Sequence, residues 1–298
     1  MEGEPKKEMH DLLPPALCPV FFNVQPLEDF DVVLKKVDDF KIRFPLIVKP
    51  EVGGQGILFR KINNETQLKN YHKQVPVEYF IQEFIEYPME VSLFYYRYPN
   101  EAKGVITGFL QKIPMQLTGD GTHTLEELVM MDIKSAKRMD EIRAKHVHNF
   151  KKVLAADEKY ILSYAANHNR GARFIDLKNE INESLVTILD NISHSVNDFF
   201  YGRYDIMCRS VEELKRGENF VILEYNGCGA EPNHFYDTGY TLINAWKEIL
   251  KHWKILFQIS RYNYKAGVDY WPALKGFRFR RETNKYYKKI KAADKIIP

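Results

Sequence analysis

Apolar runs and turn signals alternate along the chain and predict a series of short strands. Residues 46–50 (LIVKP) form an apolar run that ends at a proline, which is typical of a buried strand. The glycine-rich stretch 51–56 (EVGGQG) predicts a turn, and the alternation over residues 57–62 predicts a strand that returns from it. By the same criteria, further strands are expected over residues 79–85, 90–97, 104–111, 204–208 and 220–225.

Other segments carry apolar residues at helical spacing. A helix is predicted over residues 184–200, because apolar side chains from Leu185 to Phe199 fall on one side of it. Thr124 begins a Thr-x-x-Glu capping box, which predicts the start of another helix. Further helices are expected over residues 32–40, 64–73, 134–148 and 242–257. Because strands and helices are mixed throughout, the fold class is expected to be α+β or mixed α/β.

The composition agrees with a globular protein and excludes several classes. The chain has 298 residues, of which 45% are apolar and 28% charged, and no apolar run approaches the roughly 18 residues needed to span a bilayer. Membrane, secreted and fibrous classes are therefore excluded. Three cysteines (Cys18, Cys208 and Cys228) and an acidic start fit reduced thiols in a cytoplasmic protein better than a secreted disulfide framework.

Charge is distributed unevenly along the chain. Residues 275–298 contain nine basic and two acidic residues, a net charge of +7, whereas the whole chain carries +3. A nucleic-acid-binding protein usually spreads its basic surface over the fold, so no nucleic-acid partner is expected. The basic segment is interpreted as a solvated helix, with contact to an acidic partner or a membrane surface as the alternative.

The first group of residues with candidate chemistry is Lys49 with the loop at 53–56. Glycines allow backbone N–H groups to approach phosphate oxygens closely, and a lysine leaving the preceding strand adds a positive charge. The alternative is a tight hairpin with an exposed lysine. The loop is neither a P-loop nor a dinucleotide-binding fingerprint, because it lacks the Gly-Lys-Ser/Thr and G-x-G-x-x-G patterns.

The second group is Asp205 with Glu224 and Asn226. Glu224 and Asn226 are two positions apart on a predicted strand and therefore leave the same face of it. If the two predicted strands pair in antiparallel fashion, Asp205 lies beside them. Oxygen donors of this kind suit a hard cation such as Mg²⁺, while a solvent-facing sheet surface is the alternative interpretation.

The order of these features along the chain resembles the ATP-grasp superfamily. The resemblance is closest to its carboxylate–amine ligases, such as D-alanine–D-alanine ligase, biotin carboxylase and amino-acid ligases related to cyanophycin synthetase. It covers about two-thirds of the chain, and the matching segments are FPLIVKPEVGGQG (44–56), FIQEFIEYPMEVS (80–92), GDGTHTLEELV (119–129), GRYDIM (202–207) and ILEYNGCGAEP (222–232). It implies an ATP-grasp fold, in which two α+β subdomains hold ATP between them.

The resemblance also implies roles for individual residues around ATP and one or two Mg²⁺ ions, with Mn²⁺ as an alternative metal. The residues expected to contact the nucleotide are Lys49 and the loop Gly53, Gly54, Gln55 and Gly56 at the phosphates, Gln82, Glu83, Phe84 and Ile85 at adenine, and Glu90 at the ribose. The metal ligands implied are Asp205, Glu224 and Asn226.

Two further groups are implied to act on the substrates. Lys112 is expected to reach phosphate or the reacting centre, and Arg203 to stabilise the acyl phosphate or the tetrahedral species. The loop at 167–173 is rich in groups that bind anions, so His168, Arg170 and Arg173 are candidate substrate residues, although a solvated loop is an equal alternative. The implied reaction joins a small-molecule carboxylate to an amine. A small-molecule kinase on the same fold and a non-catalytic nucleotide-binding protein are the alternatives.

The expected organisation follows from the same resemblance. Residues 1–44 are expected to be a lead-in, 45–103 a small subdomain with the glycine-rich loop, 104–265 a large subdomain with the metal site, and 266–298 a basic tail. Related ligases carry a substrate-binding domain before the lysine strand, and here that domain is expected to be largely absent. A homodimer, a partner protein or the C-terminal region is then expected to complete the missing wall of the site.

Overall fold

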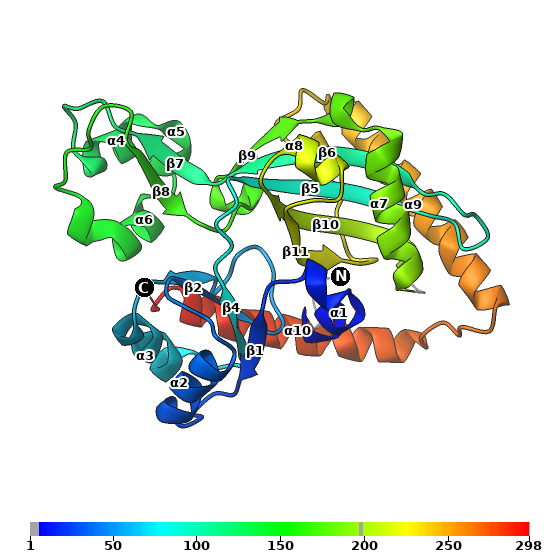
Figure 1. The fold of residues 1–298 in the computed structure, drawn as a ribbon, viewed down its shortest axis with the longest axis horizontal. Coiled ribbons are helices and arrows are strands. Elements are labelled where there is room, and N and C mark those ends of the chain that lie inside the picture. Colours follow the sequence, from blue (N-terminus) through cyan, green and yellow to red (C-terminus); the bar gives the residue numbers. More distant parts are fainter. Residues whose placement is uncertain (1–5, 197–198, 298) are drawn as a thin grey trace.

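The computed structural model describes residues 6–196 and 199–297, and it contains three β-sheets surrounded by helices (Figure 1). One sheet has four strands in the order β1-β4-β2-β3, one has five in the order β11-β10-β5-β6-β9, and the third pairs β7 with β8. All recorded strand pairs are antiparallel. The mixture of helices and antiparallel sheets confirms the α+β class expected from the sequence.

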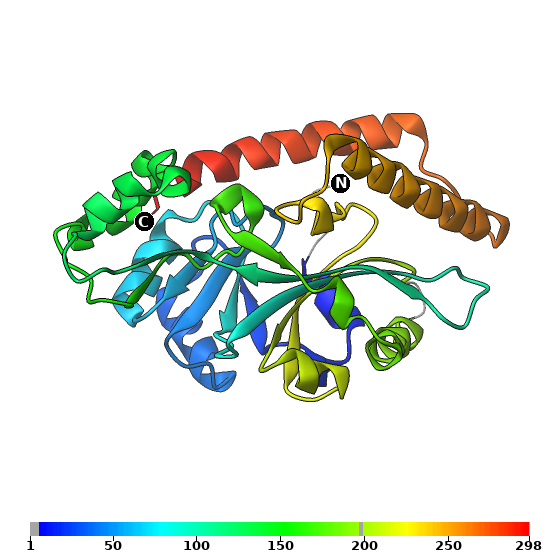
Figure 2. The same ribbon diagram turned by 90° about the horizontal axis from the view of Figure 1, so that it is seen from above.

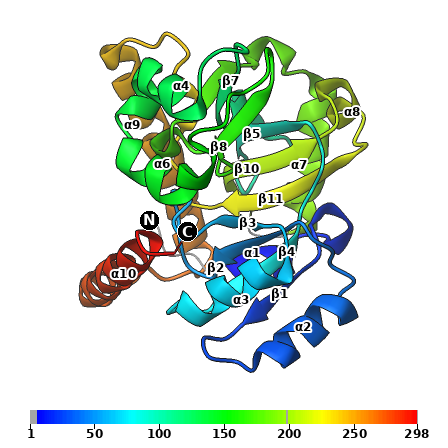
Figure 3. The same ribbon diagram turned by 90° about the vertical axis from the view of Figure 1, so that its left-hand side faces the viewer.

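The four-stranded sheet and its helices form the smaller subdomain, in the lower part of Figure 3. Its strands are β1 (Phe21–Val24), β2 (Leu46–Pro50), β3 (Arg60–Ile62) and β4 (Tyr79–Glu83), and its helices are α2 (Phe30–Asp39), α3 (Glu65–Gln74) and α10 (Ala273–Asp294). Every residue of β2 is buried, as its apolar run predicts. The side chains of Tyr287 and Ile290 on α10 pack into the same core as Leu46 and Val48.

The five-stranded sheet forms the larger subdomain. Its strands are β5 (Met89–Tyr96), β6 (Val105–Ile113), β9 (Arg173–Asp176), β10 (Tyr201–Cys208) and β11 (Phe220–Asn226). The helices α1 (Lys6–Leu12), α7 (Glu183–Ser195), α8 (Val211–Lys215) and α9 (Leu242–Lys265) flank it. Apolar residues of α7 and α8 share one core with the sheet, and Ile255 and Ile259 of α9 pack elsewhere on it, against Phe94 and Tyr201.

A third, smaller core separates part of the expected large subdomain from the rest. It is built from β7 (Met115–Thr118), β8 (Lys159–Ser163), α4 (Leu125–Met131), α5 (Ile133–Ala136) and α6 (Met139–His146). Leu125, Val129 and Leu154 are completely buried in it. The capping box predicted at Thr124 is present, since its side chain accepts from the backbone of Glu127, whose carboxylate in turn accepts from the backbone of Thr124.

The structure divides the chain differently from the expected ranges. The segment 1–44, expected as a lead-in, contributes β1 and α2 to the small subdomain, and β5 belongs to the larger sheet. The segment 266–298, expected as a basic tail, consists mostly of α10, and the buried side chains Tyr287 and Ile290 of this helix complete the small core. Over the residues that the structure describes, the chain therefore crosses between the subdomains three times, at residues 18–20, 84–88 and 266–272.

Helix ends and helix faces also differ from expectation. The helix predicted over 184–200 ends at Ser195 in the structure, and part of the predicted range lies outside the described residues. The helix predicted over 242–257 extends to Lys265, but most of the apolar residues that predicted its buried side are exposed, and Trp246 and Trp253 are 63% and 65% exposed. The helix packs instead through His252, Ile255 and Ile259. Figure 2 shows α9 and α10 as an angled pair along one edge of the molecule.

Within residues 6–196 and 199–297, the helices are all too short or too polar to cross a membrane.

Candidate active site

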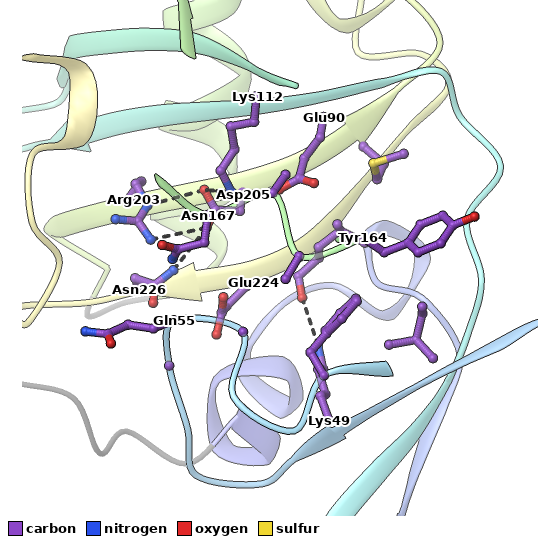
Figure 4. Close-up of a pocket in the computed structure, with 18 of the residues that line it drawn as sticks. Lys49, Gln55, Glu90, Lys112, Tyr164, Asn167, Arg203, Asp205, Glu224 and Asn226 are labelled. Atoms are coloured by element: carbon purple, nitrogen blue, oxygen red, sulfur yellow. Dashed lines mark hydrogen bonds and ion pairs between the residues drawn. The ribbon is translucent and has the colours of Figure 1, made fainter. Parts of the chain in front are cut away.

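A cleft of about 670 Å³ lies between the two larger sheets and gathers most of the residues singled out from the sequence. The glycine-rich loop and Lys49 line it from the small subdomain, and β10 and β11 line it from the large one (Figure 4). Residues 82–85, Glu90, Lys112 and His168 also line it. Of the predicted site residues, Arg170 and Arg173 are the two that do not.

The acidic group is assembled by strand pairing. In the register of β10 with β11, Asp205 lies opposite Glu224 and Arg203 lies opposite Asn226, so the predicted antiparallel pairing is confirmed. The Asn226 side chain donates to Asp205 Oδ2 at 3.4 Å. Because β10 lies between β11 and β5, Asp205 is 4% exposed, whereas Glu224 at the sheet edge is half-buried. Their oxygens face the cleft together (Figure 4).

Two cations balance the charge of Asp205. Arg203 Nε and Lys112 Nζ each lie 3.3 Å from Asp205 Oδ1. Burial by itself would raise the pKa of Asp205, but the charges of Arg203 and Lys112 outweigh it and lower the pKa to about 2. Asp205 is therefore ionised at neutral pH.

Glu90 belongs to the same charged cluster. Glu90 lies opposite Lys112 in the pairing of β5 with β6, and Lys112 Nζ donates to its Oε1 at 2.6 Å. Burial raises the pKa of Glu90, although Lys112 opposes the change. The carboxylate that the resemblance assigned to the ribose is thus engaged with Lys112, beside Asp205.

Lys49 lies across the cleft from this cluster. Its side chain is 8% exposed, and its Nζ donates to the backbone oxygen of Leu223 on β11 at 3.4 Å. Burial, with a smaller contribution from the charge of Lys6, lowers the pKa of Lys49 to about 8, although Glu224 opposes the shift. A buried, weakly compensated lysine of this kind is suited to an anionic ligand.

Helix α1 contributes a part of the site that the sequence patterns did not reveal. Lys6 Nζ lies 3.6 Å from Glu224 Oε1 and donates to the backbone oxygen of Gly53 at 3.0 Å. His10 is buried nearby, and burial together with the charges of Lys49 and Lys6 lowers its pKa to about 3. This helix of seven residues has no clear apolar periodicity, so nothing in the pattern marks it.

The glycine-rich segment forms a longer loop than expected. The strand predicted to return over 57–62 begins only at Arg60, because residues 51–59 turn back over the cleft. Gln55 and Gly56 adopt left-handed backbone conformations with φ of 58° and 68°. A Cβ on Gly56 would also lie 2.6 Å from the Ala165 side chain, so this position favours glycine.

Arg170 supports this loop and does not reach into the cleft as a substrate residue would. Its Nε donates to the backbone oxygen of Gln55 at 2.9 Å, its Nη2 lies 2.6 Å from Asp294 Oδ2, and its Nη1 pairs with Glu141. Arg173 on β9 is exposed and lies outside the cleft. Part of the positive charge in the loop 167–173 is therefore used in ion pairs within the protein and is not directed at a substrate.

His168 is the member of that loop that lines the cleft. Its ring stacks on Tyr236 with the centroids 4.6 Å apart, and its Nδ1 lies 3.6 Å from Asp237 Oδ2. Tyr236 and Asn167 also line this end of the cleft and were not singled out from the sequence. Tyr236 follows the last matching segment by four residues, so the motif stopped just short of it.

The segment predicted to hold adenine lies at the other end of the cleft. Gln82 is 4% exposed, and among the described residues its buried Oε1 has no hydrogen-bond partner. The Glu83 carboxylate accepts from the backbone of Val20 at 2.7 Å and is committed to that contact. Phe84 packs edge-on against Tyr164, and both rings carry Lys61 Nζ over a face, at 4.0 and 4.6 Å. This end is therefore aromatic and contains one unsatisfied acceptor.

Comparison with known proteins finds sequence similarity to two longer proteins. No family model matches the chain. The chain is 26% identical over 137 residues to the glutathione biosynthesis bifunctional protein GshAB of Desulfotalea psychrophila and 24% identical over 139 residues to cyanophycin synthetase of Synechocystis sp.. Each match covers 41% of this chain, but only 18% and 16% of the respective relative, so the chain spans less than a fifth of their length.

Among solved structures, the chain is similar to D-alanine–D-alanine ligase from Bacillus anthracis. It is 13% identical, with a TM-score of 0.45, over 88% of this chain and 67% of that one. The relatives found by sequence are a bifunctional protein of glutathione biosynthesis and a cyanophycin synthetase. The second agrees with the resemblance to ligases related to cyanophycin synthetase that the sequence motifs indicate. The chain thus resembles the ATP-grasp carboxylate–amine ligases, as its sequence predicts.

Proposed function

We propose that this protein is an ATP- and Mg²⁺-dependent ligase that joins a carboxylate to an amine through an acyl phosphate, on amino-acid or peptide-like substrates. The observation that carries this proposal is the pairing of Asp205 with Glu224 across β10 and β11, facing Lys49 and the glycine-rich loop. Carboxylates on one wall and a lysine with a glycine-rich loop on the other are groups that suit a metal–polyphosphate complex.

The donor set fits the metal. Asp205 is ionised, and Glu224 and Asn226 add a second carboxylate and a neutral oxygen on the same face of the sheet. Mg²⁺ prefers such oxygens and retains waters and phosphate oxygens in its remaining positions. When bound, the metal would neutralise charge on the phosphates; Mn²⁺ would serve the same donors.

The remaining cleft residues fit the nucleotide. Lys49 supplies a buried positive charge beside the loop 53–56, whose backbone can approach phosphate oxygens. The unpartnered Oε1 of Gln82 can accept from the amino group of adenine, and Phe84 and Tyr164 offer aromatic surface next to it. Glu90 accepts a hydrogen bond from Lys112, so we expect it to position Lys112 in the charged cluster and not to bind the ribose.

The two cations beside Asp205 suit the proposed reaction. A substrate carboxylate oxygen would attack the γ-phosphorus of ATP and release ADP. The amine nitrogen would then attack the acyl carbon, lose a proton and release inorganic phosphate. Arg203 and Lys112 lie together beside Asp205, where they can hold the negative charge of the acyl phosphate and of the tetrahedral species. His168 and Tyr236 would contact the substrates at that end of the cleft.

Nucleotide binding is tested by titrating ATP with and without Mg²⁺ into wild type, Asp205→Asn and Glu224→Gln. We expect Mg²⁺ to strengthen ATP binding to the wild type and to have little effect in the two variants. Glu65→Gln, which changes an exposed carboxylate on α3, is the matched control and should behave as the wild type. Equal enhancement by Mg²⁺ in all four proteins would contradict the metal assignment.

The reaction class is tested by trapping. Incubation with Mg·ATP, a panel of amino acids and hydroxylamine should give a hydroxamate and inorganic phosphate, because hydroxylamine captures an acyl phosphate. A kinase would instead leave a stable phosphorylated product and release no phosphate. A nucleotide-binding protein without activity would bind ATP and give neither product with any substrate in the panel.

A further inference from the structure

Three side chains that bind metals well meet outside the cleft. They are His234, on the short turn Asn233–Phe235 that follows β11, and Glu248 and His252, one helical turn apart on α9. One ligand atom from each lies within 4.8 Å of the other two. None of the three lines the cleft, and none has a role in the proposed reaction.

The distances match a tetrahedral metal site. His234 Nε2 and His252 Nε2 each lie 3.3 Å from Glu248 Oε1. Two donors bound at the lengths found for zinc, about 2.0–2.1 Å, stand about 3.3 Å apart when they occupy neighbouring corners of a tetrahedron. Two edges of the triangle therefore already have the required length.

The two nitrogens that face Glu248 share a single carboxylate oxygen. Both histidines are at least 96% buried, at 4% and 0% exposure. Among the described residues, His234 Nε2 and His252 Nε2 make no polar contact besides the one with Glu248 Oε1, and His234 Nδ1 makes no hydrogen bond. Buried polar atoms in proteins are almost always well satisfied, and one carboxylate oxygen shared by two buried imidazoles satisfies them poorly, which points to a missing ligand between them.

The surroundings prepare the histidines for a metal. Tyr201 Oη lies 3.2 Å from His252 Nδ1, which lets that nitrogen carry the proton and leaves Nε2 with a free lone pair. The ring of Phe94 packs edge-on against His252 at 4.5 Å and excludes water. His234 is fixed against β6, because a Cβ on Gly108 would lie 2.3 Å from its Nδ1.

We propose that His234, Glu248 and His252 bind a divalent transition-metal ion of the zinc type, which fastens α9 to the large subdomain. Two imidazoles and a carboxylate are borderline donors that select zinc-like ions over Mg²⁺, so this site is chemically distinct from the one at Asp205. Lys251 Nζ, 3.1 Å from Glu248 Oε1, is half-exposed and can move to solvent when the ion binds. The metal offsets the small apolar contact of α9, whose buried residues are His252, Ile255 and Ile259.

The test uses the full chain, stripped with EDTA and titrated with Zn²⁺ in the absence of nucleotide. We expect one Zn²⁺ per wild-type chain, and binding weaker by about 100-fold or more in Glu248→Gln and His252→Gln, since each removes a ligand and even outer-shell changes cost 10–100-fold. His148→Gln, at an exposed histidine outside the cluster, is the control and should bind as the wild type. Circular dichroism of each stripped variant shows whether it is folded.

Two further measurements keep the proposal open to contradiction if a variant fails to fold. Wild-type protein loaded with Co²⁺ should show the visible absorption of a four-coordinate ion, and Zn²⁺ should slow proteolysis within α9. Absence of stoichiometric Zn²⁺ uptake by folded wild type, or equal uptake by the Gln variants, would overturn the site. Because no nucleotide is present, failure of the ligase proposal leaves this result unaffected.

Discussion

Arg170 Nη2 and Asp294 Oδ2 form an ion pair of 2.6 Å, although the two residues are 124 positions apart in the sequence. Asp294 ends α10, and its carboxylate also accepts from the backbone of Leu58 at 2.8 Å and from Arg60 Nη1 at 3.0 Å. Through Arg170 and Leu58, the last helix therefore supports both sides of the glycine-rich loop.

Asp294→Asn is expected to loosen that loop and destabilise the fold. Removal of one partner from a buried ion pair commonly costs about 3 kcal/mol, and Arg60 and Arg170 each lose one carboxylate here, although Arg170 keeps its pair with Glu141. Urea unfolding should show a loss of this order, and ATP binding should weaken because the loop is less ordered. Glu282→Gln, an exposed carboxylate on the same helix, is the control and should change neither quantity. An unchanged ATP affinity in a folded Asp294→Asn protein would contradict the role in the loop.

The affinity for ATP is expected to depend on pH through Lys49. Its pKa lies at about 8, below the ordinary value of 10.5, so its positive charge is present at pH 7 and mostly lost at pH 9. If phosphate binding requires the charged form, affinity should fall by about 10-fold between these pH values. Lys49→Arg should remove the fall, because arginine stays protonated throughout. Calorimetric titrations of both proteins at pH 7, 8 and 9 measure it.

Lys112→Met is expected to destabilise the protein more at high pH than at low pH. The variant leaves Glu90 and Asp205 buried without this cation, which destabilises the folded state while both are ionised. A buried carboxylate has a raised pKa in the folded state, so stability is recovered as pH falls through that pKa. The melting temperature of the variant should therefore fall further below that of the wild type at pH 8 than at pH 5. The double variant Glu90→Gln/Lys112→Met should lose much of this difference, and an equal deficit at both pH values would count against the cluster.

Gln82→Met is expected to separate stability from binding. The Oε1 of Gln82 is buried without a partner among the described residues, so its replacement by an apolar side chain of similar size should stabilise the fold by about 1 kcal/mol. The same change removes the proposed acceptor for adenine and should weaken ATP binding by several-fold. Thermal melting and ATP titration test the two effects separately, and stronger ATP binding by the variant would refute the assignment.

Features set by local pattern were predicted well. The two-residue spacing of Glu224 and Asn226 and the apolar runs around them were sufficient to place Asp205 beside them, because strand periodicity fixes which side chains share a face. The capping box at Thr124 and the buried strand 46–50 were found for the same reason.

Features set by distant contacts could not be predicted. Arg170 lies in a loop whose composition is typical of an anion-binding site. Its partners Glu141 and Asp294 come from other elements, however, and already neutralise its charge. Lys6 reaches Glu224 only because α1 folds onto β11. The apolar spacing of α9 predicted a helix correctly, yet periodicity does not say which side packs, and here it is His252, Ile255 and Ile259 that do.

The three chain crossings between the subdomains determine how the cleft can move. A protein with one connecting segment can open like a book, but here any opening must be accommodated by 18–20, 84–88 and 266–272 together. A rotation that opens the cleft must therefore turn about an axis that all three segments can accommodate. The middle crossing, residues 84–88, also lines the cleft. A ligand bound next to it would contact a segment that must move when the cleft closes, which couples binding to closure.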